Sequence, residues 1–328
     1  MPRVGTRLAI RDQLGTLRAR IGIARNRYTI NPGLYCLGEP GPASPIMVTA
    51  NYKLSFDALR QELAGIDAWI LVIDTRGINV WCAAGKKTFS ADEIALQVKR
   101  VRLAEIVAHR ELLLPQLAAP GVAAHELPKK CWFKDIFGPI RAEDIRDYLA
   151  KGKQIDERMR TITFSFGERL VLIPVEIALI WKRFILITLA VFALSGFGPG
   201  LYSLPAALNR GMIATGATVL AILAGAVASP LLLPWIPGRQ FWWKGLLAGG
   251  LTGIVAIVPM TGDTSSFETL GLGLWIMTIS SHLAMNFTGA TPFTSLSGVE
   301  KEMRRGLPVQ ALGGFLALIF WLLSPFAR

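Results

Sequence analysis

The 328-residue chain is too apolar for an ordinary soluble protein: 52% of its residues are hydrophobic, only 18% are charged, and its mean hydropathy is +0.43. The charges are also unevenly placed, because residues 1–183 hold 28 Lys and Arg and 19 Asp and Glu, whereas residues 184–328 hold 7 and 4. This distribution excludes a purely cytosolic protein and predicts a water-soluble half followed by a membrane half.

The chain contains three cysteines, Cys36, Cys82 and Cys131, all in the charged half. Three thiols at no metal-ligand spacing are too few for a disulfide framework, a four-cysteine zinc site or an iron–sulfur cluster. The opening residues, MPRVGTRLAIRDQLG, lack the apolar core of a secretory signal. We therefore expect reduced thiols and a soluble half on the cytoplasmic side of the membrane.

The first 27 residues are strongly basic, with seven Arg and one Asp. Ile10, Leu14, Leu17 and Ile21 would share one face of a helix. A basic amphipathic arm on anionic lipid has this pattern, but a disordered or domain-packed extension fits it equally well. A Pro- and Gly-rich stretch completes an arm and linker that we assign to residues 1–45.

Short apolar runs alternate with helical patterns in the next segment. The expected strands are 46–50, 70–73, 106–108 and 132–137. The expected helices are 56–63, 91–101, 122–127 and 142–149. This alternation predicts an α/β domain over residues 46–176, with a parallel sheet that is covered on both faces. Ligands of such sheets bind beyond the carboxyl ends of the strands.

The candidate site lies in residues 74–93, after the second expected strand. Ser90 begins a capping box, which predicts that a regular helix starts at Ala91. The residues before it must then form a ligand-side loop or a short extra helix. That segment would place Trp81 and Cys82 over the crevice of the sheet.

Nucleotide-binding motifs are absent from this segment. A Walker A loop that ended at Lys86 would need Gly in place of Val80 and Ser or Thr in place of Lys87, and no G-x-G-x-x-G opens a helix in the soluble half. Neither His109 nor His125 has the Asp-x-His-x-x-Gly context of histidine-ligated cobalamin modules. The candidate for a side chain that binds a metal of a cofactor is therefore a cysteine.

The eight residues NVWCAAGK, from Asn79 to Lys86, match at every place the N-[VI]-W-C-A-[AG]-G-K signature of one corrinoid-protein family. The chain thus resembles HgcA, the membrane-anchored corrinoid protein family of mercury methylation. Residues 48–57, 119–126 and 138–145 resemble the same family and, more weakly, the corrinoid domain of the corrinoid iron–sulfur protein of acetyl-CoA synthesis. The resemblance covers residues 31–176 and implies a Rossmann-like or flavodoxin-like domain that holds a cobalamin-type corrinoid.

The resemblance implies that the thiolate of Cys82 is the lower axial ligand of the corrinoid cobalt. Physical chemistry favours such a role, because a helix N-terminus and the charges of Lys86 and Lys87 stabilise a thiolate, and a soft thiolate suits a late transition metal. It further implies that Asn79 fixes a cap helix and that Trp81 packs against the macrocycle.

The small residues of the signature are expected to allow close approach to the flat ring. The full implied set of corrinoid-binding residues is Thr49, Asn79, Val80, Trp81, Cys82, Ala83, Ala84, Gly85, Lys86, Gly121, Val122, Gly138 and Ala142. At Thr49, Gly121, Val122, Gly138 and Ala142, ordinary turn and capping chemistry is an equal alternative.

The activity that the resemblance implies is a corrinoid-dependent methyl transfer from methyl-Co(III) to Hg(II), which gives methylmercury. A methylated folate or pterin, or a protein that carries it, would supply the methyl group. This chain lacks a cluster-binding cysteine set, so the resemblance implies a two-cluster [4Fe-4S] ferredoxin partner, HgcB, which returns the cobalt to Co(I). No nucleic-acid partner is indicated.

Five apolar stretches of spanning length follow in residues 177–328, which we assign to a membrane domain. They lie at 180–197, 211–230, 243–260, 268–288 and 308–325. Lys and Arg cluster on one side of these stretches, so the positive-inside rule predicts an inner-membrane protein with a cytoplasmic soluble half. Arg210, Asp263, Glu268 and Arg328 are then expected outside the membrane.

His282 is the single ionisable residue expected inside the spans, and it shares a helix face with Thr278 and Asn286. An intramembrane histidine is a functional candidate, but we favour interhelical hydrogen bonding as its role. Two other functions remain open. One is a corrinoid methyl carrier of one-carbon metabolism with mercury as an adventitious acceptor, and the other is a membrane transporter with a regulatory α/β domain.

Overall fold

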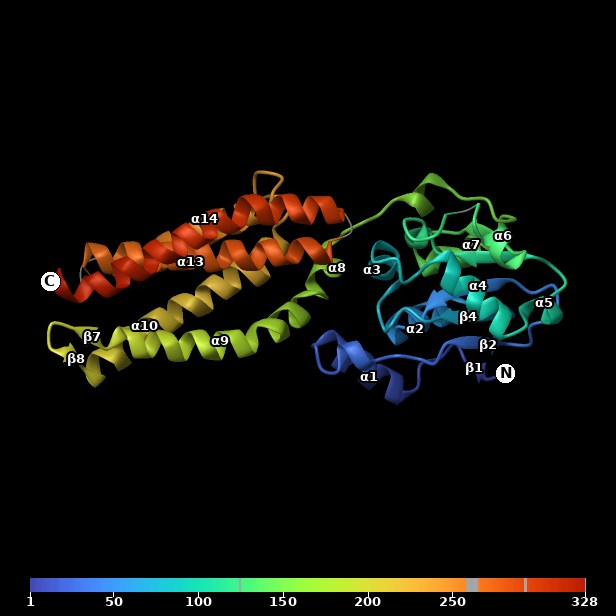
Figure 1. Ribbon diagram of the computed structural model, residues 1–328, viewed down its shortest axis with the longest axis horizontal. Helices are drawn as coiled ribbons and strands as arrows, with labels where there is room; N and C mark the ends of the chain where they lie inside the picture. Colours follow the sequence, from blue (N-terminus) through green and yellow to red (C-terminus); the bar gives the residue numbers. More distant parts are fainter. Residues whose placement is uncertain (124, 258–264, 292–293, 328) are drawn as a thin grey trace. The chain divides into compact units, whose positions relative to one another are not determined.

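The computed structural model describes residues 1–123, 125–257, 265–291 and 294–327, which form two compact units, Met1–Thr163 and Phe164–Arg328 (Figure 1). The division differs from the expected boundary after residue 176. The helical unit already begins with α8 (Phe166–Leu170), whose first turn is capped by Ser165, and continues as α9 (Ile173–Ser195).

The first unit contains a six-stranded sheet with the strand order β1-β2-β4-β3-β5-β6. The strands are β1 (Arg3–Val4), β2 (Gly33–Leu37), β3 (Ile46–Ala50), β4 (Ala68–Ile73), β5 (Glu111–Leu114) and β6 (Lys134–Phe137). Strands β4, β3, β5 and β6 are parallel, whereas β2 is antiparallel to β4. Counted along the chain, the parallel strands have the order 2-1-3-4 of flavodoxin-like sheets, so the predicted α/β class is confirmed.

Three parts of the sheet differ from the sequence expectation, one of which is β1, in the expected basic arm. The strand expected at 106–108 is wrong, because the chain there ends the helix α5 (Leu103–Ile106) and the strand follows at β5, where the buried Leu112 and Leu114 pack into the core. Part of the expected linker is also a strand. Residues of β2 pair with β4 from Gly33 opposite Val72 to Leu37 opposite Ala68.

Helices cover both faces of the sheet (Figure 1). Side chains alternate along β3, so that Ile46 and Val48 pack with α4 while Met47 packs with α2 and α7. The α-helices of this unit are α1 (Ile10–Arg20), α2 (Lys53–Glu62), α3 (Val80–Gly85), α4 (Ala91–Arg100), α5, α6 (Leu127–Cys131) and α7 (Ile145–Ala150). Short 3-10 turns are η1 (Arg25–Arg27), η2 (Gln116–Ala118), η3 (Ala142–Asp144) and η4 (Glu157–Arg160).

The second unit is helical. It contains α8, α9, α10 (Leu204–Ile222), η5 (Leu223–Ala228), α11 (Ser229–Leu231), α12 (Phe241–Ile257), α13 (Ser266–Asn286), η7 (Phe287–Ala290), α14 (Leu296–Leu323) and η8 (Ser324–Phe326), with a hairpin of β7 (Phe197–Gly198) and β8 (Leu201–Tyr202). Within the described ranges, four helical segments are long and apolar enough to cross a membrane: Phe166–Ser195, Leu204–Leu231, Ser266–Ala290 and Ser297–Phe326.

The count of four differs from the five expected spans. The remaining expected span, 243–260, corresponds to the shorter apolar helix α12, and its last three residues, together with Asp263 and Arg328, lie outside the described residues.

Polar side chains join the helices of the second unit. His282 Nδ1 lies 3.2 Å from Gln310 Oε1, and Gln310 Nε2 donates to Ser281 Oγ at 3.0 Å, which links α13 to α14. This contact favours the structural interpretation of His282. The expectation that His282 is the single ionisable residue inside the spans is wrong, since Arg210 and Glu268 lie in α10 and α13, are both buried, and approach to 3.9 Å.

Candidate functional site

A cavity of about 340 Å³ lies at the carboxyl ends of β3, β5 and β6 in the first unit. Strands β3 and β5 are neighbours in the sheet. The strand that follows β3 along the chain, β4, lies on one side of this pair, and the strand that follows β5, β6, lies on the other. The cavity therefore occupies the switch point where ligands of such sheets bind. Six of the residues expected to contact a corrinoid line it: Thr49, Asn79, Val80, Trp81, Gly138 and Ala142.

The helix α3 forms a cap at this cavity. Asn79 precedes its first turn, and Asn79 Oδ1 accepts a hydrogen bond from the backbone N–H of Cys82 at 2.9 Å. Asparagine is a favoured residue at this N-terminal capping position. Cys82 is half-buried with a free thiol, two residues after Val80, where the helix begins. Unlike Val80 and Trp81, Cys82 itself is not among the residues that line the cavity. The expected short cap helix that carries Cys82 is therefore present.

The buried side of α3 packs against the protein itself. Ala83 and Ala84 are buried, and a Cβ atom on Gly121 would stand 2.8 Å from Ala84 Cα and 2.2 Å from the carbonyl oxygen of Phe89. The small residues thus allow the cap to approach the domain core. Val122 also lies in that core, so neither Gly121 nor Val122 lines the cavity.

Gly85 and Lys86 close the cap helix on its exposed side. The Lys86 backbone N–H donates to the Cys82 carbonyl at 3.0 Å, and both Gly85 and Lys86 face solvent. Neither residue lines the cavity, and Lys87 beside them is exposed as well. Their contribution to the site is the end of the helix and a local positive charge.

Asn51 fixes the loop that leads into the cap, a role that the sequence analysis missed. Its Oδ1 accepts hydrogen bonds from the backbone N–H groups of Thr75 and Gly77, both at 3.0 Å, and its Nδ2 donates to Asp74 Oδ1 at 3.0 Å. Asn51 is buried, so these bonds are shielded from water. The position of Asn51 just after β3 was the available signal.

Two buried tyrosines were also missed. Tyr148 lines the cavity, and among the described residues its hydroxyl has no hydrogen-bond partner. Burial raises the pKa of this hydroxyl. A buried donor without a partner costs free energy, which a bound ligand can recover. No sequence signal marked Tyr148, because its place in the cavity depends on how α7 packs on the sheet.

Tyr52 is the second tyrosine, and it directly precedes α2. Its hydroxyl is likewise buried without a hydrogen-bond partner in the described part of the chain. Burial raises the pKa of Tyr52, the charges of Arg25 and Arg20 lower it, and the charge of Cys82 raises it again. The guanidinium carbon of Arg25 lies 5.7 Å from the centre of the Tyr52 ring.

Comparisons with known proteins concern this first unit. Residues 16–131 match the family model of the CO dehydrogenase/acetyl-CoA synthase delta subunit. The chain is 30% identical over 129 residues to the acetyl-CoA decarbonylase/synthase complex subunit gamma of Archaeoglobus fulgidus, a match that covers 39% of this chain and 27% of that protein. The subunit of the same name from Methanopyrus kandleri is 34% identical over 97 residues, which cover 29% of this chain and 21% of that protein.

The chain spans about a quarter of the length of the curated relatives it matches. The segment matched by the family model contains β3, β4, β5 and the cap helix, but ends before Gly138 and Ala142. The first unit is therefore similar to subunits of the enzymes of acetyl-CoA synthesis. This relationship agrees with the weaker of the two resemblances noted from the sequence.

Proposed function

We propose that this chain is a corrinoid-dependent methyltransferase of the HgcA type, which transfers a methyl group to Hg(II) and so produces methylmercury. One observation carries the proposal: a free cysteine, Cys82, lies on a capped helix beside a cavity at the switch point of a flavodoxin-like sheet. The eight residues from Asn79 to Lys86 that form this cap match the HgcA signature, and the names of the relatives support one-carbon chemistry.

The residues at the cavity fit part of a corrinoid. The cavity is mostly apolar, Thr49 and Tyr148 are among the residues that line it, and its volume of about 340 Å³ is at the lower end of ligand pockets. We propose that Cys82 Sγ holds the cobalt and that Trp81 and Val80 contact the ring. Thr49 and Tyr148, with the nearby Gly138 and Ala142, would hold the portion that enters the cavity. When bound, a corrinoid carries a methyl group on cobalt and supplies it to an acceptor.

The chain itself positions and tunes the metal ligand. Asn79 holds the first turn of α3, and Ala83 and Ala84 fix the other side of this helix to the core. The Cys82 thiolate would donate electron density to the metal, since soft thiolates are strong donors to late transition metals. The transfer requires no general acid or base, so we assign no such role to His109 or His125.

We propose that the partners are a two-cluster [4Fe-4S] ferredoxin of the HgcB type and a methylated folate or pterin, or its carrier protein. The four long apolar helices support membrane association. The positive-inside pattern supports an inner-membrane location with the first unit in the cytoplasm.

A second candidate function is methyl delivery to a native acceptor in one-carbon metabolism, with mercury methylated only adventitiously. The names of the relatives favour this candidate, because they describe subunits of acetyl-CoA decarbonylase/synthase complexes. The two functions share the fold, the cavity and Cys82, and they differ in the methyl acceptor.

The direct test is mercury methylation by membranes that contain the full chain, with and without the ferredoxin partner. The proposal predicts methylmercury formation that requires both proteins and that disappears in Cys82→Ala. Efficient transfer to an acetyl-CoA synthase subunit, with little transfer to Hg(II), would instead establish the carrier function. A purified protein that takes up no corrinoid, as judged by its visible spectrum, would contradict both.

A further inference from the structure

The helix α1 has two opposite faces. Asp12, Thr16 and Ala19 lie on the face that packs against the rest of the first unit; Ala19 is buried and the other two are partly buried. Ile10, Leu14, Leu17 and Ile21 are 75%, 55%, 57% and 37% exposed. At about 100° per residue, these four side chains form a row on the opposite side of the helix. We call them the apolar row.

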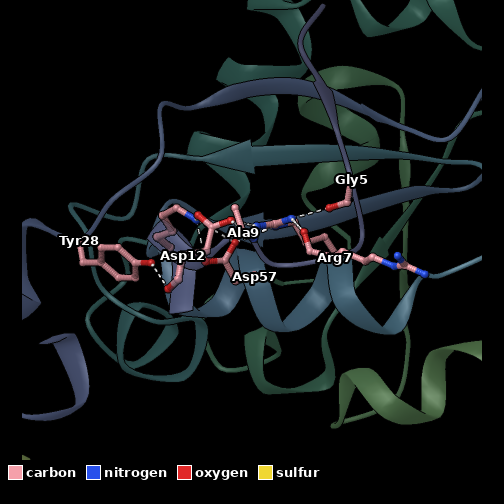
Figure 2. A network of polar contacts seen from close by, with 8 residues as sticks. Gly5, Arg7, Ala9, Asp12, Tyr28 and Asp57 are labelled. Atoms are coloured by element: carbon pink, nitrogen blue, oxygen red, sulfur yellow. Dashed lines mark hydrogen bonds and ion pairs between the residues drawn. The ribbon is translucent and has the colours of Figure 1, made fainter. Parts of the chain in front are cut away.

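A partly buried network of charges fixes the inner face of α1 (Figure 2). Asp12 Oδ1 lies 2.7 Å from Lys53 Nζ, and Asp12 Oδ2 lies 2.8 Å from Arg60 Nη2. Asp57, on α2, pairs with both of these cations at 2.7 Å. The Tyr28 hydroxyl donates to the Asp12 carbonyl at 3.1 Å.

Breaking such a network would leave uncompensated charges in the protein, because Asp57 and Arg60 are buried. Rotation of α1 about its axis would separate Asp12 from Lys53 and Arg60. The network therefore holds the apolar row on the outside of the first unit.

The same network removes negative charge from the outer surface. Asp12 is the one acidic residue among the first 27, and its carboxylate faces Lys53 and Arg60. Arg11 and Arg18 flank the apolar row on one side and Arg20 flanks it on the other, and all three are exposed. The outer face of α1 is thus an apolar row between cations.

We propose that α1 docks the first unit on an anionic lipid surface, with the apolar row in the boundary between headgroups and acyl chains and Arg11, Arg18 and Arg20 on lipid phosphates. Interfacial helices have this arrangement of an apolar row between basic residues, and each arginine near an anionic leaflet adds to the attraction. A bilayer is also the surface nearest to hand for a chain whose described residues include four apolar helices of spanning length.

Docking of α1 would also stabilise the loop that precedes the cap helix α3. The arm continues from α1 to Thr29, which bridges to Tyr52, and a Cβ atom on Gly77 would stand 2.8 Å from Thr29 Cγ2. Gly77 belongs to the loop that Asn51 holds before α3. The lipid-bound arm would therefore contact the loop that leads into α3, the helix that carries Cys82. The docking itself does not depend on the identity of the ligand or the methyl acceptor.

The test measures the solvent access of the apolar row in the full chain. Leu14→Cys is placed in nanodiscs of phosphatidylcholine or of an equal mixture of phosphatidylcholine and phosphatidylglycerol, and its reaction with a water-soluble maleimide is followed by peptide mass spectrometry. We expect the labelling rate to fall by roughly tenfold in the anionic discs and to recover at high salt. Glu39→Cys, at an exposed site outside α1, is the matched control and should react equally in both discs.

A charge variant separates lipid from protein as the occupant. Arg11→Gln, Arg18→Gln and Arg20→Gln, combined with Leu14→Cys, should restore fast labelling in the anionic discs. Equal rates for Leu14→Cys in both kinds of disc would overturn the proposal, because the row would then face water or another part of the chain. Protection that requires added ferredoxin would also overturn it and would identify a protein interface.

Discussion

Asn79 holds Cys82 in place: the Asn79 side-chain oxygen accepts the backbone N–H of Cys82 at 2.9 Å in the first turn of α3. A helix of six residues is too short to persist by itself, so its geometry depends on this cap and on packing. The position of the Cys82 thiol is consequently sensitive to residues that never touch a ligand.

Asn79→Ala should weaken corrinoid retention. Loss of an N-terminal cap costs about 1 kcal/mol, which corresponds to roughly a fivefold loss of affinity if the cap must be formed for binding. Titration of the purified protein with corrinoid, followed by absorbance, measures the change. Ser90→Ala is the matched control, since Ser90 Oγ accepts the Glu93 N–H at 3.3 Å at the start of α4. An equal effect of Ser90→Ala would show that general stability, and not the cap, governs binding.

Gly121→Ala should displace the cap helix from the core. The added Cβ atom would stand 2.8 Å from Ala84 Cα, and overpacking of this kind costs about 1–3 kcal/mol. We expect a lower melting temperature and faster corrinoid release. Gly41→Ala is the control, because nothing lies within 4 Å of the added atom. Unchanged corrinoid release in Gly121→Ala would argue against a rigidly seated cap.

Tyr148→Phe should separate ligand binding from stability. The Tyr148 hydroxyl is buried without a partner among the described residues, so its removal should leave the melting temperature of the ligand-free protein unchanged or slightly higher. Corrinoid affinity should fall several-fold if the hydroxyl donates to the ligand. Tyr35→Phe should behave in the opposite way, since the Tyr35 hydroxyl donates to the Asn31 carbonyl at 2.7 Å. Unaltered affinity in Tyr148→Phe would remove this residue from the binding site.

Acid should release the N-terminal arm. Burial raises the pKa of Asp12. Hydrogen bonds from Lys53, the Ala9 backbone and Arg60, together with the charge of Lys53, lower the pKa by more than burial raises it, so that it lies below the ordinary value of 3.8. A carboxyl group with a lowered pKa in the folded state stabilises that state above its unfolded pKa and loses this contribution as the pH falls through the folded value. Hydrogen exchange of α1, corrected for intrinsic rates, should therefore accelerate below about pH 4.

Asp12→Asn provides the comparison for the acid experiment. This variant should show fast exchange in α1 at neutral pH and no further step on acidification, while α4 remains protected in both proteins. An identical acid step in Asp12→Asn would assign the release to other carboxyl groups.

Local patterns predicted the elements whose boundaries depend on local chemistry. The strand at β3 and the start of α4 at Ala91 were predicted correctly, because a bounded apolar run and the Ser90 cap are both visible in the sequence. Strand β2 was missed because Gly and Pro surround it and its partner, β4, lies far along the chain. Arg210 and Glu268 were misplaced because charged residues near helix ends resemble loop residues until the helices are packed.

The features of the candidate site also fall into those that local sequence predicts and those that depend on tertiary packing. The signature around Cys82 and the strand ends at Thr49 and Gly138 lie in the sequence itself, and the cavity at this edge is consistent with them. The packing of Gly121 behind the cap and the place of Tyr148 in the cavity depend on contacts between distant segments. Such contacts leave no periodic pattern.

The bond between cobalt and the sulfur of Cys82 is the central claim, and X-ray absorption at the cobalt edge of the corrinoid-loaded full chain measures it directly. We predict a sulfur scatterer in the first coordination shell of the unaltered protein and its loss in Cys82→Ala. A first shell of nitrogen and oxygen alone in the unaltered protein would contradict the claim.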